Sequence, residues 1–290
     1  MKDLPAFQLY EQTAASCSKL VTQEYSTSFS IGINTLDESL HAPIYGIYAM
    51  VRFADEIVDS FHGFEKEYLL EKFKQDVYAA IANKISLNPV LHSFQKVVNT
   101  YHIPHELIEA FFKSMEMDLY QKTYVANDYQ AYIHGSAEVV GLMCLKVFIE
   151  GDEKLYEELK EPAKSLGAAF QKVNFLRDMN SDYLERGRVY FPGVDFTHFC
   201  ESSKQQIEKE IALDFELAYQ GIIRLPVKAR VGVLLAYKYY LKLFQKIRKL
   251  RVNQIKETRI RIPNFEKITI LAQTYILLRF FIFLKPFRTY

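Results

Sequence analysis

The chain has 290 residues, of which 49% are hydrophobic, and its 36 basic and 35 acidic residues leave a formal net charge of +1. This length and apolar content suffice for one large folded domain, and the near-neutral charge argues against a dedicated nucleic-acid-binding protein. The three cysteines, Cys17, Cys144 and Cys200, have the spacing of neither a disulfide framework nor a zinc site. We therefore expect a protein of the reducing cytoplasm, with no nucleic acid among its partners.

Apolar residues recur with the helical period through most of the chain, which predicts an all-α protein. The predicted helices cover residues 7–24, 36–61, 65–83, 89–101, 104–121, 127–150, 152–184, 203–222, 226–250 and 264–284. The segment from Gly187 to Thr197 is the long stretch without a helical pattern. Because no Gly/Ser linker, low-complexity tract or block of charge marks a boundary, we predict a single domain over residues 1–290.

The two ends of the chain differ in character. The first residues lack the apolar core of a signal peptide, which favours the cytoplasm. Residues 268–284 are mostly apolar but include Arg279, and about 17 residues fall short of the ~20 that span a bilayer. A buried final helix is one interpretation. The other is a peripheral contact of residues 264–285 with the inner membrane surface, because Phe280–Phe283 precede Lys285 and Arg288.

Two Asp-x-x-x-Asp pairs stand out, one in the second predicted helix and one in the seventh. Asp55 and Asp59 form the first pair, and Asp178 and Asp182 form the second. Four residues are slightly more than one helical turn, so the carboxylates of each pair share a helix face about 6 Å apart along the axis. Like charges at this spacing repel unless a cation lies between them, and hard carboxylate oxygens suit Mg²⁺.

Each pair has companions that suit the binding of an anion. Arg52 precedes Asp55 by three residues, Arg177 is adjacent to Asp178, and Asn174 lies one turn before Asp178. The apolar residues that flank both pairs indicate that they face an interior. If the two helices pack antiparallel, facing side chains can build one site in a bundle interior. The pattern therefore predicts a site for metal and diphosphate between the two helices.

These same segments resemble the two signature regions of the squalene/phytoene synthase family. The segments that carry the resemblance are residues 52–59, residues 171–182 and residues 187–192. Shorter matches, in the order expected for the family, are residues 25–29, 115–119, 132–143 and 259–263. The resemblance covers nearly the whole chain, and its second signature region is long and specific.

The resemblance implies an all-α isoprenoid-synthase fold around a central apolar cavity, with Mg²⁺ as cofactor and Mn²⁺ as an alternative. It implies that the metal ligands are Asp55, Asp59, Asn174, Asp178 and Asp182. It implies a catalytic role for the four aspartates and for Tyr132, and it places around the substrate Tyr25, Ser28, Arg52, Gln171, Asn174, Arg177, Tyr239 and Arg259.

The activity implied is a head-to-head condensation of two prenyl diphosphates through a cyclopropylcarbinyl diphosphate. Residues 115–119 are more similar to the phytoene branch, which favours geranylgeranyl diphosphate as substrate and phytoene as product, without NADPH. A squalene or dehydrosqualene synthase that uses farnesyl diphosphate is the alternative, and squalene formation would require NADPH. A non-catalytic helical scaffold is an alternative of another class, because Thr27 stands where many relatives carry a basic residue.

Overall fold

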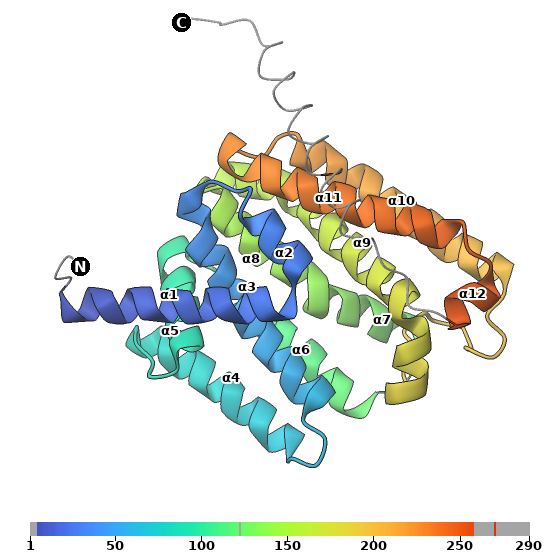
Figure 1. The fold of residues 1–290 in the computed structure, drawn as a ribbon, viewed down its shortest axis with the longest axis horizontal. Coiled ribbons are helices and arrows are strands. Elements are labelled where there is room, and N and C mark those ends of the chain that lie inside the picture. The colour runs from blue at the N-terminus through green and yellow to red at the C-terminus, as the bar shows by residue number, and fades with distance from the viewer. Residues whose placement is uncertain (1–4, 122, 258–269, 271–290) are drawn as a thin grey trace, which may run out of the picture.

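The computed structural model describes residues 5–121, 123–257 and 270, and it confirms the all-α class (Figure 1). In the described part of the chain, the nearest approach to β-structure is an isolated bridge between Thr123 and Val189. The helices are α1 (Ala6–Tyr25), α2 (Thr27–Ile33), α3 (Glu38–Ser60), α4 (Lys66–Asn83), α5 (Pro89–Tyr101), α6 (His105–Tyr120), α7 (Ala126–Ile133), the π-helix η1 (His134–Glu138), α8 (Val139–Phe148), α9 (Glu153–Arg186), α10 (Glu201–Ile222), α11 (Val227–Arg248) and α12 (Val252–Glu257).

A short helix that the sequence pattern did not predict, α2, follows α1 after a single residue. Ser26 has an extended backbone, with φ −150° and ψ 94°, so it ends α1. Its hydroxyl then accepts a hydrogen bond from the backbone N–H of Phe29 and caps the start of α2. After the break, α2 packs against α3 and α11. Tyr25 lies beside Arg52, and Ser28 lines a pocket with Arg177.

The predicted helix 127–150 is interrupted in its middle by the π-helix η1. Gly135 lies at this point because the backbone of α6 approaches closely: a Cβ atom there would lie 2.4 Å from the carbonyl oxygen of Ala110 and 2.7 Å from Cβ of Ser114. Such π-bulges often occur at functional sites. Here the π-helix begins two residues after Tyr132, whose ring centroid lies 6.0 Å from that of Phe175 on α9.

Replacing Gly135 by alanine is expected to destabilise the fold by about 1–3 kcal/mol, because the new methyl group overpacks against a backbone atom that cannot move freely. Urea unfolding measures the change. Gly32→Ala is the matched control, since a Cβ there meets nothing within 4 Å and alanine favours the helix. Equal stability of the two variants would contradict the close packing of η1 on α6.

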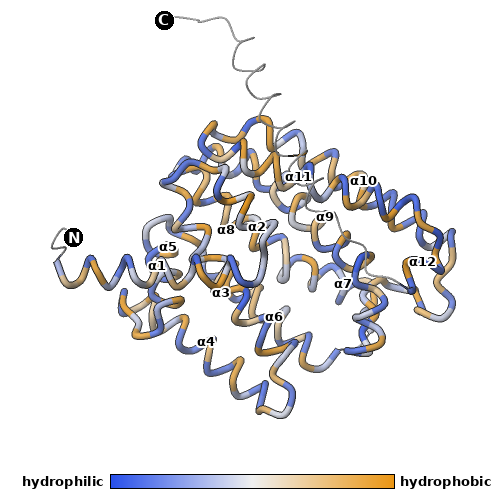
Figure 2. Tube along the Cα trace, viewed as in Figure 1, coloured by the Kyte–Doolittle hydropathy of each residue, from blue (hydrophilic) through white to orange (hydrophobic). Residues whose placement is uncertain are grey.

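Two buried clusters fill the interior. The first lies mainly among α3, α4, α5, α6 and α8, and the second among α7, α9, α10, α11 and α12. Figure 2 shows hydrophobic and hydrophilic residues alternating along the helices, as expected of amphipathic helices that bury one face. The predicted site residues on α3 therefore lie on a helix of the first cluster, and those on α9 lie on a helix of the second.

One helical stretch of the described chain, Ala126–Phe148, is long and apolar enough to span a membrane by length and composition alone. Half of its most apolar window is buried inside the molecule, as in the core helix of a globular protein. The last predicted helix, residues 264–285, lies outside the described residues except for Ile270. Its burial or membrane contact therefore stays a prediction.

Candidate active site

The two acidic pairs lie at the converging C-terminal ends of α3 and α9. Asp59 is one residue from the end of α3, and Asp182 is four residues from the end of α9. Both pairs thus lie near the C-terminus of a helix, although the elements from α4 to α8 separate the two helices in the chain. The C-terminal end of a helix carries partial negative charge, so this arrangement concentrates negative potential between the aspartates.

Arginine side chains bridge the space between these two helix ends, which make little direct contact. Nη1 of Arg188 donates to Oδ1 of Asp59 at 2.9 Å. Nη1 of Arg186 donates to Oδ1 of Asp182 at 2.9 Å, and its Nε lies 3.6 Å from Oδ1 of Asp59. The structure therefore brings the two predicted pairs into one site, with guanidinium groups between them.

A buried carboxylate on α6, Asp118, anchors one of these arginines. Its side chain is 5% exposed, and it accepts hydrogen bonds from the hydroxyls of Tyr132 at 2.7 Å and Tyr124 at 3.1 Å. Nη1 of Arg188 lies 3.5 Å from Oδ1 of Asp118, and its Nη2 donates to the Asp118 carbonyl oxygen at 2.8 Å. This network orients the hydroxyl of Tyr132, a predicted catalytic residue.

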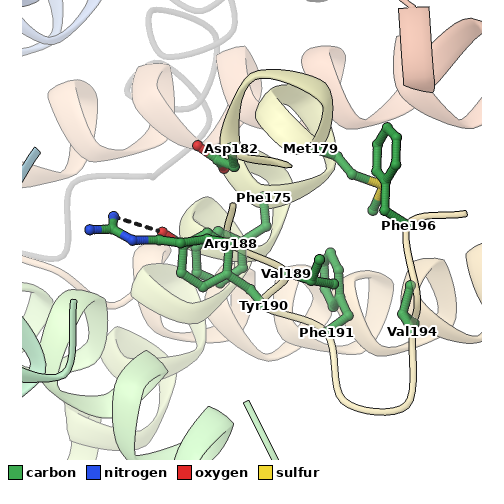
Figure 3. Close-up of a pocket in the computed structure, with 9 residues that line it drawn as sticks. All are labelled: Phe175, Met179, Asp182, Arg188, Val189, Tyr190, Phe191, Val194 and Phe196. Carbon is green, nitrogen blue, oxygen red and sulfur yellow. Dashed lines mark hydrogen bonds between the residues drawn. The ribbon is translucent and has the colours of Figure 1, made fainter. Parts of the chain in front are cut away.

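Aromatic rings form the wall beside the network. The Tyr190 ring stacks on Phe175 with centroids 4.0 Å apart and on Tyr132 with centroids 5.3 Å apart. Figure 3 shows a small pocket here, with Asp182 and Arg188 on one side and the rings of Phe191 and Phe196 on the other. Such π faces stabilise a cation without offering a nucleophile that would capture it.

Each predicted diphosphate-binding arginine that the structure describes lies beside an acidic residue. Nη2 of Arg52 donates to Oε1 of Glu56 at 2.5 Å, Nη1 lies 3.9 Å from Oδ2 of Asp55, and the guanidinium lies 4.5 Å from the centroid of the Tyr25 ring. Arg177 binds Asp178 with two nitrogens, its Nε at 3.0 Å from Oδ1.

A larger pocket, which is open to solvent, lies beside Arg177 between α2, α9 and α11. Tyr239 and Ser28, both predicted to bind substrate, line it together with apolar side chains. The lining residues are Ser26, Ser28, Phe29, Ile31, Gly32, Arg177, Leu235, Ala236, Tyr239, Tyr240 and Ile270. An arginine at one side of an apolar groove suits a ligand with an anionic head and a hydrocarbon tail.

The donor set of the site fits a hard divalent cation. Oδ1 of Asn174 is buried and has no hydrogen-bond donor in the described part of the chain, although it lies on the same face of α9 as Asp178 and Asp182. A buried carbonyl oxygen that accepts no hydrogen bond and lies near carboxylates is available as a ligand of a metal ion. Among the described residues, no three acidic, histidine or cysteine side chains already form a metal-binding group. To bind a metal ion, the aspartates would therefore have to release the arginines that they now contact.

In this arrangement, the pKa values of three carboxyl groups are raised. Burial raises the pKa of Asp55 to about 7, and repulsion by Asp59 and Asp118 adds to the effect against the opposing influence of Arg52. Burial and the charge of Asp178 raise the pKa of Asp182 to about 7. Burial also raises the pKa of Asp118 to about 6 despite Arg188. An additional cation would relieve the cost of the ionised forms.

Comparison with known proteins agrees with this geometry. A family model described as squalene/phytoene synthase matches residues 22–266. The chain belongs to the squalene/phytoene synthase family. Family membership supports a prenyltransferase that condenses prenyl diphosphates head to head, and it confirms the family predicted from the sequence.

Individual relatives within the family are distant. The 4,4'-diapophytoene synthase of Staphylococcus haemolyticus is 26% identical over 205 residues, which are 69% of each chain. The phytoene synthase of Rhodobacter capsulatus is 25% identical over 262 residues, which cover 82% of this chain and 74% of the relative. The crystal structure of a dehydrosqualene synthase in complex with ligand is similar with a TM-score of 0.80 at 20% identity, covering 94% of this chain and 99% of that chain. The last likeness confirms the fold.

Most site residues expected from the family resemblance have a described position, whereas their roles stay predictions. Gln171 lies on α9 one turn before Asn174, on the same helix face as the second acidic pair. Arg259 lies outside the described residues. Five residues of the site had no assigned role in the sequence analysis: Glu56, Asp118, Arg186, Arg188 and Tyr190. All of these except Arg186 fall inside segments of the family resemblance, so a polar residue within a signature segment was the available signal.

The stabilisation of the protein by Mg²⁺ is expected to increase with pH between about 6 and 8. Asp55 and Asp182 have folded-state pKa values of about 7, above the usual value near 3.8, so without metal their ionisation lowers stability as pH rises from about 4 to 7. Mg²⁺ binds the ionised forms and removes that cost. Thermal unfolding with EDTA and with Mg²⁺, each at about pH 6 and about pH 8, measures the difference. An equal increase in Tm at both pH values would contradict the site.

Proposed function

We propose that this protein condenses two molecules of geranylgeranyl diphosphate head to head to form phytoene, with Mg²⁺ as cofactor. The observation that carries the proposal is the meeting of Asp55 and Asp59 with Asp178 and Asp182 beside an apolar, aromatic-lined interior. Family membership supports the reaction class. The similarity of residues 115–119 to the phytoene branch favours the longer substrate.

The chemistry requires a diphosphate to leave an allylic carbon. Mg²⁺, when bound by the aspartates and Asn174, would stabilise the negative charge that develops on the leaving group. Arg52 and Arg177 would each hold diphosphate oxygens once they leave their acidic neighbours, because a guanidinium forms paired hydrogen bonds to phosphate oxygens. Their position at the edge of a desolvated interior makes each of these interactions stronger than in water.

The carbon skeleton then changes in two stages. The first C–O bond breaks to give an allylic cation and diphosphate, and the cation alkylates the double bond of the second substrate. Loss of a proton closes the cyclopropane ring of a cyclopropylcarbinyl diphosphate. Loss of the second diphosphate, rearrangement and loss of a further proton give the hydrocarbon. The rings of Phe175, Tyr132 and Tyr190 would exclude water and stabilise these cations.

A shorter substrate, farnesyl diphosphate, is the second candidate. One of the relatives is a 4,4'-diapophytoene synthase, and one of the similar solved structures is a dehydrosqualene synthase. The head-group site would serve both substrates in the same way. The length of the apolar cavity decides between them.

Incubation with geranylgeranyl or farnesyl diphosphate, with and without Mg²⁺ and NADPH, tests the proposal. The hydrocarbon is extracted and identified by mass spectrometry. A forty-carbon product from geranylgeranyl diphosphate that needs Mg²⁺ but not NADPH supports phytoene synthesis. A thirty-carbon product alone moves the assignment to the dehydrosqualene or squalene branch. No product from either substrate would contradict the enzymatic function and favour the scaffold alternative.

A further inference from the structure

Arg186 occupies an unusual place at the junction of the two acidic pairs. It is the last residue of α9, and its guanidinium touches Asp182 on its own helix and Asp59 on α3. Within the described part of the chain, the hydrogen bonds and ion pairs of Arg186 are with these two aspartates. Its side chain is 29% exposed, so it has a path to solvent.

The neighbouring Arg188 provides a useful contrast. Its side chain is 8% exposed and is fixed by the carbonyl oxygen and carboxylate of Asp118. Arg186 lacks such an anchor. Gly187, which follows it, has φ 66° and ends the helix, so Arg186 lies at a helix terminus where the intrahelical hydrogen bonds stop.

The carboxylate oxygens that a metal ion would need already contact guanidinium groups. Oδ1 of Asp182 accepts its hydrogen bond, and Oδ1 of Asp59 faces both Arg186 and Arg188. A metal ion bound by the same carboxylates would lie within a few ångströms of the guanidinium, where two positive charges repel strongly in a partly buried site. Metal binding therefore requires Arg186 to leave.

We infer that Arg186 is an exchangeable counterion of the active site. Without metal it neutralises Asp59 and Asp182 and holds the ends of α3 and α9 together. When Mg²⁺ binds these carboxylates, Arg186 leaves them, and its guanidinium turns to the oxygens of the diphosphate that arrives with the metal. Arg186 is thus a positioning residue, and this inference rests on the metal site of the proposed function.

Titration calorimetry with Mg²⁺ alone tests the exchange, because it needs no turnover. Arg186→Gln removes the competing charge, so Mg²⁺ is expected to bind about three- to tenfold more tightly than to the wild-type protein. Arg186→Lys keeps the charge and is expected to stay within about twofold of the wild type. Arg224→Gln is the matched control, because Arg224 pairs with Glu158 near the opposite end of α9 and should leave Mg²⁺ binding unchanged.

A second titration measures the other half of the exchange. With saturating Mg²⁺, inorganic diphosphate is expected to bind Arg186→Gln about tenfold more weakly than the wild type, since one charged hydrogen-bond donor is lost. Tighter Mg²⁺ and weaker diphosphate binding in the same variant is a combination that a merely structural arginine would not produce.

Unchanged or weaker Mg²⁺ binding in a folded Arg186→Gln variant would overturn the inference and leave the metal site standing. If that variant does not fold, NMR of ¹⁵N-arginine-labelled wild-type protein gives the answer. The Arg186 side-chain signal, identified by its loss in Arg186→Lys, should shift when Mg²⁺ is added, and an unmoved signal would overturn the inference. Absence of Mg²⁺ binding to the wild type would overturn the metal site as well.

Discussion

Asp55→Asn is expected to reduce Mg²⁺-dependent condensation by about a hundred- to a thousandfold while the metal-free protein becomes more stable. The loss of activity follows because a neutral amide no longer balances the charge of a metal at the leaving group. The gain in stability follows because burial and neighbouring carboxylates already penalise the ionised form of Asp55, whose pKa is raised to about 7. Steady-state turnover and thermal unfolding in EDTA at about pH 8 measure the two effects.

Asp178→Asn tests the second pair in the same way and is expected to cause a comparable loss of turnover. Asp76→Asn on α4 is the matched control, because Asp76 is an exposed aspartate paired with Lys72 at a helical i,i+4 spacing. It should change neither turnover nor stability beyond a few tenths of a kcal/mol. Full turnover in both Asp55→Asn and Asp178→Asn would rule out the assignment of the acidic pairs.

Arg188→Met is expected to destabilise the protein by about 3–5 kcal/mol, because it leaves the buried carboxylate of Asp118 without its cation. Tyr124 and Tyr132 would still donate hydrogen bonds to Asp118, but no positive charge would remain in contact with it. Urea unfolding at about pH 8 measures the loss. The loss should be smaller near pH 5, since the pKa of Asp118 is already about 6 with Arg188 present and protonation removes the unpaired charge.

Two further variants show whether the buried charge is the cause. Adding Asp118→Asn to Arg188→Met should restore part of the lost stability, because the double variant removes both charges. Arg224→Met removes an exposed arginine that pairs with Glu158, and it should cost no more than about 1 kcal/mol. If Arg188→Met and Arg224→Met were equally stable, the network around Asp118 would not hold the site together.

The sequence was sufficient to predict the helices and the two acidic pairs because both depend on short periodic patterns. The 3.6-residue period locates most helices within a few residues, and the Asp-x-x-x-Asp spacing places each pair on one helix face. The break at Ser26 was readable in principle, since a serine followed by a short helix is a common N-cap. The π-helix after Tyr132 was not, because it depends on the close approach of α6 to Gly135.

The contacts between distant segments could not be predicted from spacing. Asp118 and Arg188 are 70 positions apart, and their pairing depends on how α6 packs beside the segment after α9. The approach of the C-terminal ends of α3 and α9 likewise depends on the packing of the intervening helices, which no local sequence pattern encodes. Arg186 had no assigned role in the sequence analysis, because its contact with Asp59 joins residues 127 positions apart.

We propose that the converging ends of α3 and α9 bind a metal–diphosphate group. A crystal structure of the protein with Mn²⁺ and a farnesyl thiodiphosphate, which does not ionise readily, tests it most directly through the anomalous signal of the metal. We expect metal ions between the Asp55–Asp59 and Asp178–Asp182 pairs, with the diphosphate on the arginines and the hydrocarbon in the apolar interior. Metal and diphosphate bound elsewhere, with Arg186 still on Asp59 and Asp182, would contradict it.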